Sequence, residues 1–110
     1  MTISGDFPHI TNRRITSNGI ELNIAEQGDA DAPLIVMLHG FPESWFSWRH
    51  QFAPLAAAGY HVVAPDMRGY GESDKPSDIS AYNQVEVVND VKGLVAALGY
   101  ETAIVIGHDW

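Results

Sequence analysis

The sequence predicts an α/β fold, in which a mostly parallel sheet carries an antiparallel hairpin at its N-terminal end. Strand-like and helix-like segments alternate after residue 33, which is typical of parallel sheets with helical crossovers. The run 34–38 is continuously apolar, as expected of a strand covered on both faces. Before it, alternating apolar residues follow Asn18-Gly19, a pair that favours tight hairpin turns. The chain has 110 residues, the length of one small domain.

The N-terminal hairpin is expected to pair a strand over about residues 10–16 with one over 20–24. Apolar residues at every second position of the latter segment indicate a half-buried strand. A turn-rich loop over 28–33 follows, because Gly, Asp and Pro cluster there. The apolar strand 34–38 comes next, and Gly40 and Pro42 break it.

A first helix is expected to begin near Ser44. Pro54 should kink or interrupt it, because proline lacks the amide hydrogen that a helix interior requires. Gly59 suits its end. Its apolar residues recur at helical spacing and are interpreted as the buried face: Trp45, Trp48, Phe52 and Leu55.

Strands over 60–64 and 102–106 are expected to flank a second helix. A loop over 65–77 leads to that helix, for which Ser80 suits the N-cap and Gly99 the position after the end. One apolar stripe runs along it: Tyr82, Val85, Val88, Val91, Val95 and Leu98.

The last predicted strand would lie at an open edge of the sheet or beside missing neighbours. We therefore expect residues 1–110 to be the N-terminal portion of a single core domain in a longer protein.

Composition narrows the functional classes. Fourteen acidic residues against six basic ones give a formal charge of −8, which argues against binding to nucleic acid or to anionic lipid. The absence of cysteine excludes disulfides, thiolate zinc sites and thiol catalysis. No apolar run reaches the roughly 18 residues of a membrane span, and the N-terminus does not resemble a signal peptide. A cytoplasmic protein without metal or cofactor is expected, and its oligomeric state is not indicated.

Three loops are expected beyond the carboxyl ends of the strands, where such sheets bind ligands: 39–43, 66–73 and 107–110. In the last, Gly107-His108-Asp109-Trp110 matches the start of a nucleophile elbow, with Asp109 in the nucleophile position.

An aspartate in that position indicates a particular chemistry. A carboxylate displaces a leaving group from saturated carbon and forms an alkyl ester, which activated water then hydrolyses. The Trp110 amide would supply one oxyanion-hole donor, and a second would come from the turn near Phe41.

These motifs resemble the epoxide hydrolases of the α/β-hydrolase fold. The resemblance rests on His39-Gly40-Phe41-Pro42-Glu43 together with Gly107-His108-Asp109-Trp110 and runs from about residue 20 to the end. It implies Asp109 as nucleophile, and Phe41 and Trp110 as backbone oxyanion-hole donors that contact a small-molecule epoxide. The residues that support these loops would be His39, Gly40, Pro42, Gly107 and His108. It also implies a later acid and histidine base and a cap domain with two tyrosines, so residues 1–110 alone should be inactive.

Related dehalogenases use the same aspartate and remain an alternative. Haloalkane dehalogenases typically carry Asn where this chain has Phe41, and haloacetate dehalogenases typically carry Arg where it has Trp110. Both differences favour the resemblance to epoxide hydrolases. A non-catalytic binding module of this fold also remains open. The alternative of a nucleotide-binding fold is disfavoured, because Gly69-Tyr70-Gly71 lacks the third glycine of a phosphate loop.

Several other polar residues are given structural roles. His39 and His108 are expected to form hydrogen bonds near the site, and a zinc site built on them with Asp109 has no supporting ligand spacing. Ser73 is expected to serve a turn. Glu43 and Arg68 are expected to brace their loops.

Overall fold

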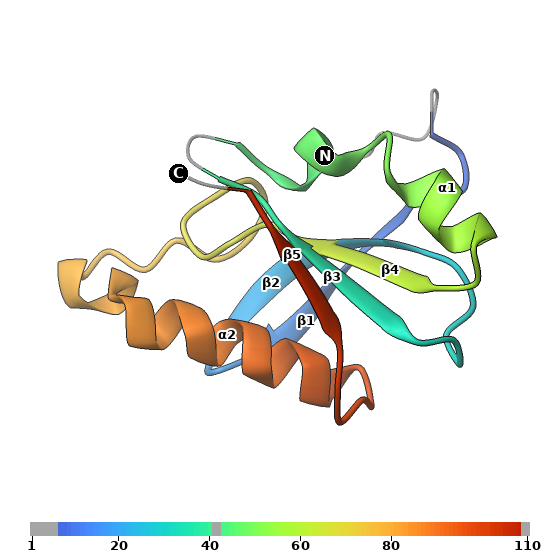
Figure 1. Cartoon of the computed structure of the whole chain (residues 1–110). Coiled ribbons are helices and arrows are strands. Elements are labelled where there is room, and N and C mark those ends of the chain that lie inside the picture. Colours follow the sequence, from blue (N-terminus) through green and yellow to red (C-terminus); the bar gives the residue numbers. More distant parts are fainter. Residues whose placement is uncertain (1–6, 41–42, 109–110) are drawn as a thin grey trace.

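The computed structural model describes residues 7–40 and 43–108, which form a five-stranded sheet with helices on both faces (Figure 1). In chain order the elements are β1 (Thr11–Ser17), β2 (Ile20–Gln27), β3 (Leu34–Leu38), the 3-10 helix η1 (Trp45–Trp48), α1 (Phe52–Ala57), β4 (His61–Pro65), the 3-10 helix η2 (Ile79–Tyr82), α2 (Gln84–Ala97) and β5 (Ile104–Gly107).

The N-terminal hairpin is confirmed. β1 pairs antiparallel with β2, and Ser17 lies opposite Ile20 next to the turn. Both turn residues have positive φ, 52° at Asn18 and 79° at Gly19, which is the backbone of a tight two-residue hairpin turn.

The sheet has the order β1-β2-β4-β3-β5. β3 lies between β4 and β5 and runs parallel to both, whereas β2 joins the hairpin to β4 in antiparallel pairing. The sheet is therefore mixed, with its three parallel strands at the end away from the hairpin. Loops that follow β3, β4 and β5 all leave the same edge of the sheet, as predicted for the site.

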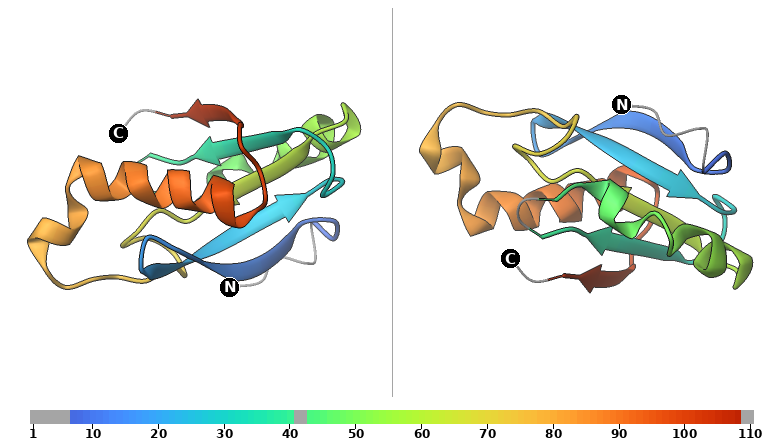
Figure 2. Two further views of the ribbon diagram at one scale, coloured as in Figure 1. Left: turned by 90° about the horizontal axis from the view of Figure 1, so that it is seen from below. Right: turned by 90° about the horizontal axis from the view of Figure 1, so that it is seen from above.

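Helices lie on both faces of the sheet (Figure 2), and each face has its own apolar core. η1 and α1 cover one face, where Phe52 is fully buried and Trp45 nearly so. α2 covers the other, with Leu94 fully buried against the sheet. The strand β3 contributes to both cores through alternate side chains, which confirms that it is covered on both faces.

The single helix expected from Ser44 is wrong in detail. Ser44 caps η1, because its side chain accepts a hydrogen bond from the Phe46 amide, but α1 begins separately at Phe52. Pro54 lies in the first turn of α1, where its missing amide hydrogen costs no intrahelical bond. The predicted helix is interrupted, but the break lies at residues 49–51 and not at Pro54, which α1 contains. Gly59 follows the helix with a φ of 101°, as predicted for its end.

Ser80 is not the N-cap of the second helix. The side chain of Asn83 accepts a hydrogen bond from the Glu86 amide at 3.0 Å and caps α2. Ser80 lies instead inside η2, whose N-cap is Asp78. Sequence alone did not separate these caps, because Asn, Asp and Ser are all favourable at such positions.

The apolar stripe of α2 is buried at one end. Val95 and Leu98 pack against the core, whereas Val85 and Val88 are 66% and 55% exposed. Asp90 is buried instead, because it forms an ion pair with the loop after β4.

β5 is the edge strand of the described sheet, and its Val105 is half exposed. Within residues 7–40 and 43–108, no helix is long and apolar enough to cross a membrane.

Candidate active site

The loops after β3 and β5 begin side by side. Leu38 pairs with Gly107 in the parallel register, and the His108 amide donates a hydrogen bond to the Leu38 carbonyl at 3.1 Å. The two segments that carry the predicted motifs therefore leave the sheet next to each other, although they are separated by about 70 residues of sequence.

Four of the predicted site residues lie outside the described residues: Phe41, Pro42, Asp109 and Trp110. Their roles as nucleophile, oxyanion-hole donors and loop support stay predictions. The described residues on either side of them are Gly40, Glu43 and His108, and these locate the two loops.

Glu43 and His108 join the two loops. The Glu43 carboxylate lies 3.7 Å from His108 Nδ1, and both side chains are more than one third exposed. They line a hollow beside η1 together with Ser47, Trp48 and Gln51. Glu43 thus braces its loop, as predicted, although a contact this exposed contributes little to stability.

His39 has a structural role, as predicted. Its side chain is buried, and its Nε2 accepts a hydrogen bond from the Met67 amide at 2.9 Å. Nδ1 lies 3.0 Å from the Gly40 carbonyl oxygen, so the ring is a neutral imidazole with its proton on Nδ1. Both ring nitrogens are engaged, which leaves neither for a metal ion.

Ser73 also has a structural role, and it is buried. Its hydroxyl donates to the Asp66 carbonyl at 2.6 Å and accepts from the Asn23 amide at 2.8 Å. The loop after β4 is thereby fixed to β2, and the hydroxyl proton is directed at a backbone carbonyl, which is not a base that could activate a nucleophile.

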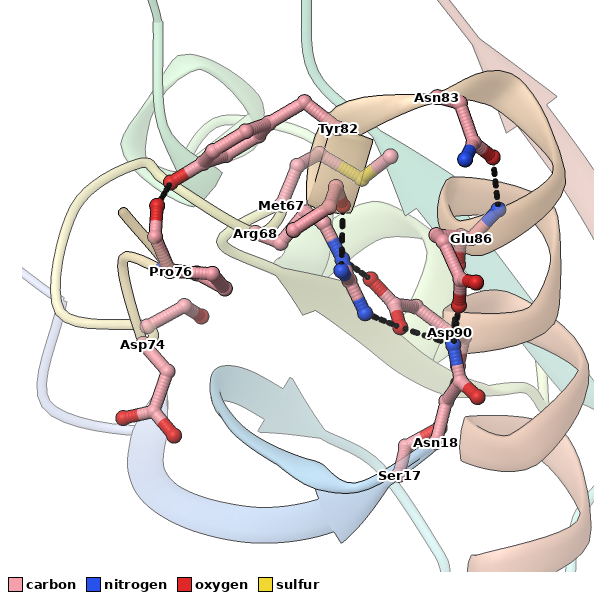
Figure 3. Close-up of polar contacts among 12 residues, drawn as sticks. Ser17, Asn18, Met67, Arg68, Asp74, Pro76, Tyr82, Asn83, Glu86 and Asp90 are labelled. Atoms are coloured by element: carbon pink, nitrogen blue, oxygen red, sulfur yellow. Dashed lines mark hydrogen bonds and ion pairs between the residues drawn. The ribbon is translucent and has the colours of Figure 1, made fainter. Parts of the chain in front are cut away.

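Arg68 braces the same loop through a buried ion pair with Asp90 of α2 (Figure 3). Two of its nitrogens donate to the two carboxylate oxygens, each at 2.7 Å, and a third donates to the Ala81 carbonyl. The Asp90 hydrogen bonds raise the pKa of Arg68, although burial acts in the opposite direction. Ser17 and Asn18 of the hairpin turn also donate to Asp90.

Sequence reasoning missed Asp90 and Asp66. The available signal at Asp90 was a charged residue four positions before Leu94, on the face of α2 that packs against the sheet. Asp66 directly follows a buried strand, but within the segment 66–73 only Arg68 and Ser73 were given roles from the sequence.

A second polar cluster lies at the other end of the sheet. His61 is buried, and its two ring nitrogens contact the Glu26 carboxylate at 2.9 Å and the Tyr100 hydroxyl at 3.0 Å. Arg13 also pairs with Glu26. Burial would raise the pKa of the Glu26 carboxyl, but hydrogen bonds from Arg13 and His61 and their charges lower it below 4.5. This cluster is remote from the loops of the candidate site, because it surrounds the start of β4.

Among the described residues, no group of three His, Cys, Asp or Glu side chains is placed to hold a metal ion.

The chain is similar to known proteins over most of its length. Residues 33–110 match the family model described as alpha/beta hydrolase fold. The chain is 52% identical to the AB hydrolase superfamily protein YfhM of Bacillus subtilis over 87% of its length, and 48% identical to epoxide hydrolase A of Mycobacterium tuberculosis over 91%. These alignments cover 34% and 31% of the relatives, so the chain spans about a third of their length.

Solved structures agree with this similarity. The epoxide hydrolase VrEH1 of Vigna radiata superposes with a TM-score of 0.91 at 42% identity, covering 96% of this chain and 32% of that one. Epoxide hydrolase A of Mycobacterium thermoresistibile gives 0.90 at 48% identity, covering 92% and 32%. With the family model covering more than half of its residues, the chain belongs to the alpha/beta hydrolase fold family.

Proposed function

We propose that this chain is the N-terminal, nucleophile-bearing part of an epoxide hydrolase that converts epoxides into vicinal diols. The observation that carries the proposal is the pairing of Leu38 with Gly107, closed by the hydrogen bond from the His108 amide to the Leu38 carbonyl. This pairing brings the start of the loop with Phe41 next to the start of the loop with Asp109. The epoxide hydrolases among the similar proteins support the same reading.

In the first half of the proposed reaction, a carboxylate oxygen of Asp109 attacks an epoxide carbon. A new carbon–oxygen ester bond forms while the strained carbon–oxygen bond of the epoxide breaks. The ring oxygen leaves as an alkoxide and takes up a proton, which a cap tyrosine of the full-length protein would donate. A carboxylate suits this displacement, because it is a competent nucleophile toward saturated carbon.

In the second half, water attacks the carbonyl carbon of the Asp109 ester. Negative charge develops on the carbonyl oxygen, where the backbone amides of Phe41 and Trp110 would donate hydrogen bonds. Collapse of this intermediate releases the diol and leaves one water oxygen in the carboxylate. The base that activates the water and the cap that binds the epoxide would belong to the rest of a full-length protein, so residues 1–110 alone are expected to be inactive.

The remaining predicted residues support the two loops in this proposal. His39 and Gly40 lead into the loop with Phe41 and Pro42, and His108 and Gly107 lead into the elbow. The chemistry needs no metal or cofactor, since the carboxylate is the nucleophile and amides stabilise the charge. The substrate is a small-molecule epoxide.

Isotope labelling of the full-length protein tests the proposal. A single turnover in oxygen-18 water should add about 2 Da to the peptide that contains Asp109, because water cleaves the ester at the enzyme's own carbonyl. Asp109→Ala should lose both the label and nearly all diol formation. Asp109→Ser should not become an efficient hydrolase, because its ether product has no carbonyl for water to attack.

Two results would contradict the proposal. Label found in the diol alone after one turnover would mean that water attacks the epoxide directly and that Asp109 is a general base. Halide release from haloalkanes in place of diol formation would favour a dehalogenase with the same nucleophile. The Phe41 side chain argues against that alternative, since it has no donor for a halide.

A further inference from the structure

Asp66 is a buried carboxylate that ties three segments of the chain together. Its side chain follows β4 directly and is about 1% exposed. Oδ1 accepts a hydrogen bond from the Trp45 amide at 2.8 Å. Oδ2 accepts from the Glu72 amide at 2.9 Å and from Asn23 Nδ2 at 3.0 Å. Both oxygens are therefore engaged by N–H donors, which is the way a buried carboxylate is made tolerable without a cation.

The Trp45 amide is the contact that matters for the candidate site. Trp45 is the first residue of η1 and lies four positions after Phe41 in the sequence. Its hydrogen bond to Asp66 fixes the far end of that loop to the chain just after β4.

The near end of the same loop is fixed by the adjacent residue. The Met67 amide donates to His39, and His39 Nδ1 in turn lies 3.0 Å from the Gly40 carbonyl oxygen. That carbonyl also accepts from the Glu43 amide at 2.8 Å. The loop is thus held at both ends by two consecutive residues, Asp66 and Met67.

The loop after β4 is shaped around the Asp66 carboxylate. Gly71 has a φ of 52°, and a Cβ on it would lie 2.2 Å from Asp66 Oδ2. The carboxylate cannot move aside without losing its own hydrogen bonds. Glycine at this position therefore allows the close approach that lets the Glu72 amide reach Asp66.

We propose that Asp66 is a positioning residue for ester hydrolysis: it holds the loop so that the Phe41 amide meets the developing oxyanion. This rests on the proposed function of Phe41 and Asp109. An oxyanion donor works because it is already in place when charge develops, and a displacement of about 1 Å costs on the order of 100-fold in rate. The proposal concerns the second half of the reaction, since the carbonyl oxyanion forms there.

The variant Asp66→Asn in the full-length protein separates this role from simple stabilisation. Asparagine has one side-chain oxygen, and this oxygen accepts two hydrogen bonds if it faces the Glu72 amide and Asn23 but only one if it faces the Trp45 amide. The first orientation is therefore favoured, and it places the NH₂ group against the Trp45 amide. We expect ester hydrolysis to slow by about 10- to 100-fold, less than the roughly 100- to 1000-fold cost of deleting an oxyanion donor. Ester formation should change little, so acid-quenched intact protein should show accumulated ester on Asp109 by mass spectrometry.

Two further variants serve as controls. Asn23→Ala removes a hydrogen bond from the same carboxylate but leaves the Trp45 contact, so it should lower stability without accumulation of ester. Exchanging the two side chains, Asp66→Asn with Asn23→Asp, lets the new aspartate accept from the asparagine NH₂ group. The asparagine oxygen can then return to Trp45, while the Glu72 amide loses its acceptor, so hydrolysis should recover even though stability does not fully return. If Asp66→Asn alone does not fold, the exchanged pair is compared directly with the wild type.

The outcomes are distinguishable. If the wild-type protein forms neither ester nor diol, the proposed function fails. If the wild type is active and Asp66→Asn slows ester formation and hydrolysis equally, Asp66 is a structural residue and the positioning role is wrong. The same conclusion follows if the exchanged pair folds and still accumulates ester.

Discussion

Removing the carboxylate of Asp90 should destabilise the protein strongly. The Arg68 side chain is 5% exposed, and Asp90→Ala would leave its buried guanidinium with the Ala81 carbonyl as its remaining partner among the described contacts. Breaking a buried ion pair from one side costs about 3–5 kcal/mol, because an uncompensated charge stays buried. The higher helix propensity of alanine offsets at most about 0.7 kcal/mol of this.

Urea unfolding of the full-length protein at pH 7 measures this cost as a change in the free energy of unfolding. A matched control is Arg14→Met, because Arg14 forms ion pairs with Glu21 and Asp74 while its side chain is 44% exposed. Each such surface pair contributes about 0.2–1 kcal/mol. The double variant Arg68→Met with Asp90→Leu should be more stable than Asp90→Ala, since it leaves no buried charge.

The reasoning fails if Asp90→Ala costs no more than Arg14→Met. It also fails if the double variant is less stable than Asp90→Ala, because an unpaired buried arginine would then not be the source of the loss. Circular dichroism at both ends of the titration checks that each variant begins folded.

Three further outcomes are expected. Gly28→Ala should lower the melting temperature far more than Gly59→Ala. Both glycines have φ above 100°, so alanine at either position would carry a backbone strain of roughly 1–3 kcal/mol. At Gly28 the new Cβ would also lie 2.2 Å from the backbone oxygen of Tyr60, whereas at Gly59 no atom lies within 4 Å. Glu26→Gln should lower stability at pH 7. Hydrogen bonds from Arg13 and His61 outweigh burial and lower the pKa of Glu26 in the folded protein. The ionised carboxylate therefore stabilises the fold fully above its ordinary pKa, and this stabilisation is lost as the pH falls through the folded pKa. Unfolding measured from pH 7 to 3 should show the difference in stability between the variant and the wild type becoming smaller. Phe41→Asn should still hydrolyse the Asp109 ester, since the proposed oxyanion donor is a backbone amide that the substitution keeps. Accumulation of ester on Asp109, measured by mass spectrometry in a folded variant, would contradict that assignment.

The strands and the hairpin could be predicted because their signals are local. The positive φ values of Asn18 and Gly19 follow from a two-residue turn between alternating strands, and β3 follows from five consecutive apolar residues. The same locality explains the errors on the helices. Ser80 satisfies a local rule for capping, but Asn83 is the residue whose side chain reaches an amide in the first turn of α2, that of Glu86.

The polar contacts that hold the site could not be predicted, because each joins residues far apart in sequence. Asp66 contacts Trp45 and Asn23 across 21 and 43 positions, and Arg68 contacts Asp90 across 22. No periodicity encodes such pairs. The sequence did predict the edge of the sheet at which these polar residues meet, since the carboxyl ends of parallel strands must lie together.

The position of the two motifs relative to each other is fixed by the apolar core. In the observed register Met37 pairs with Ile106 and packs on the face covered by α1, whereas Val36 pairs with Val105 and packs on the face covered by α2. A slip of one residue would turn each β5 side chain to the opposite face and move His108 by about 3.3 Å along β3. The slip would replace Ile106, which packs into the core on the face covered by α1, with the smaller Val105 or Gly107, and this loss of apolar burial opposes it. The register of β5 on β3 therefore sets where His108 lies relative to the end of β3 at Leu38. Substitutions in this part of the core that permit a slip should impair the proposed chemistry before they unfold the protein.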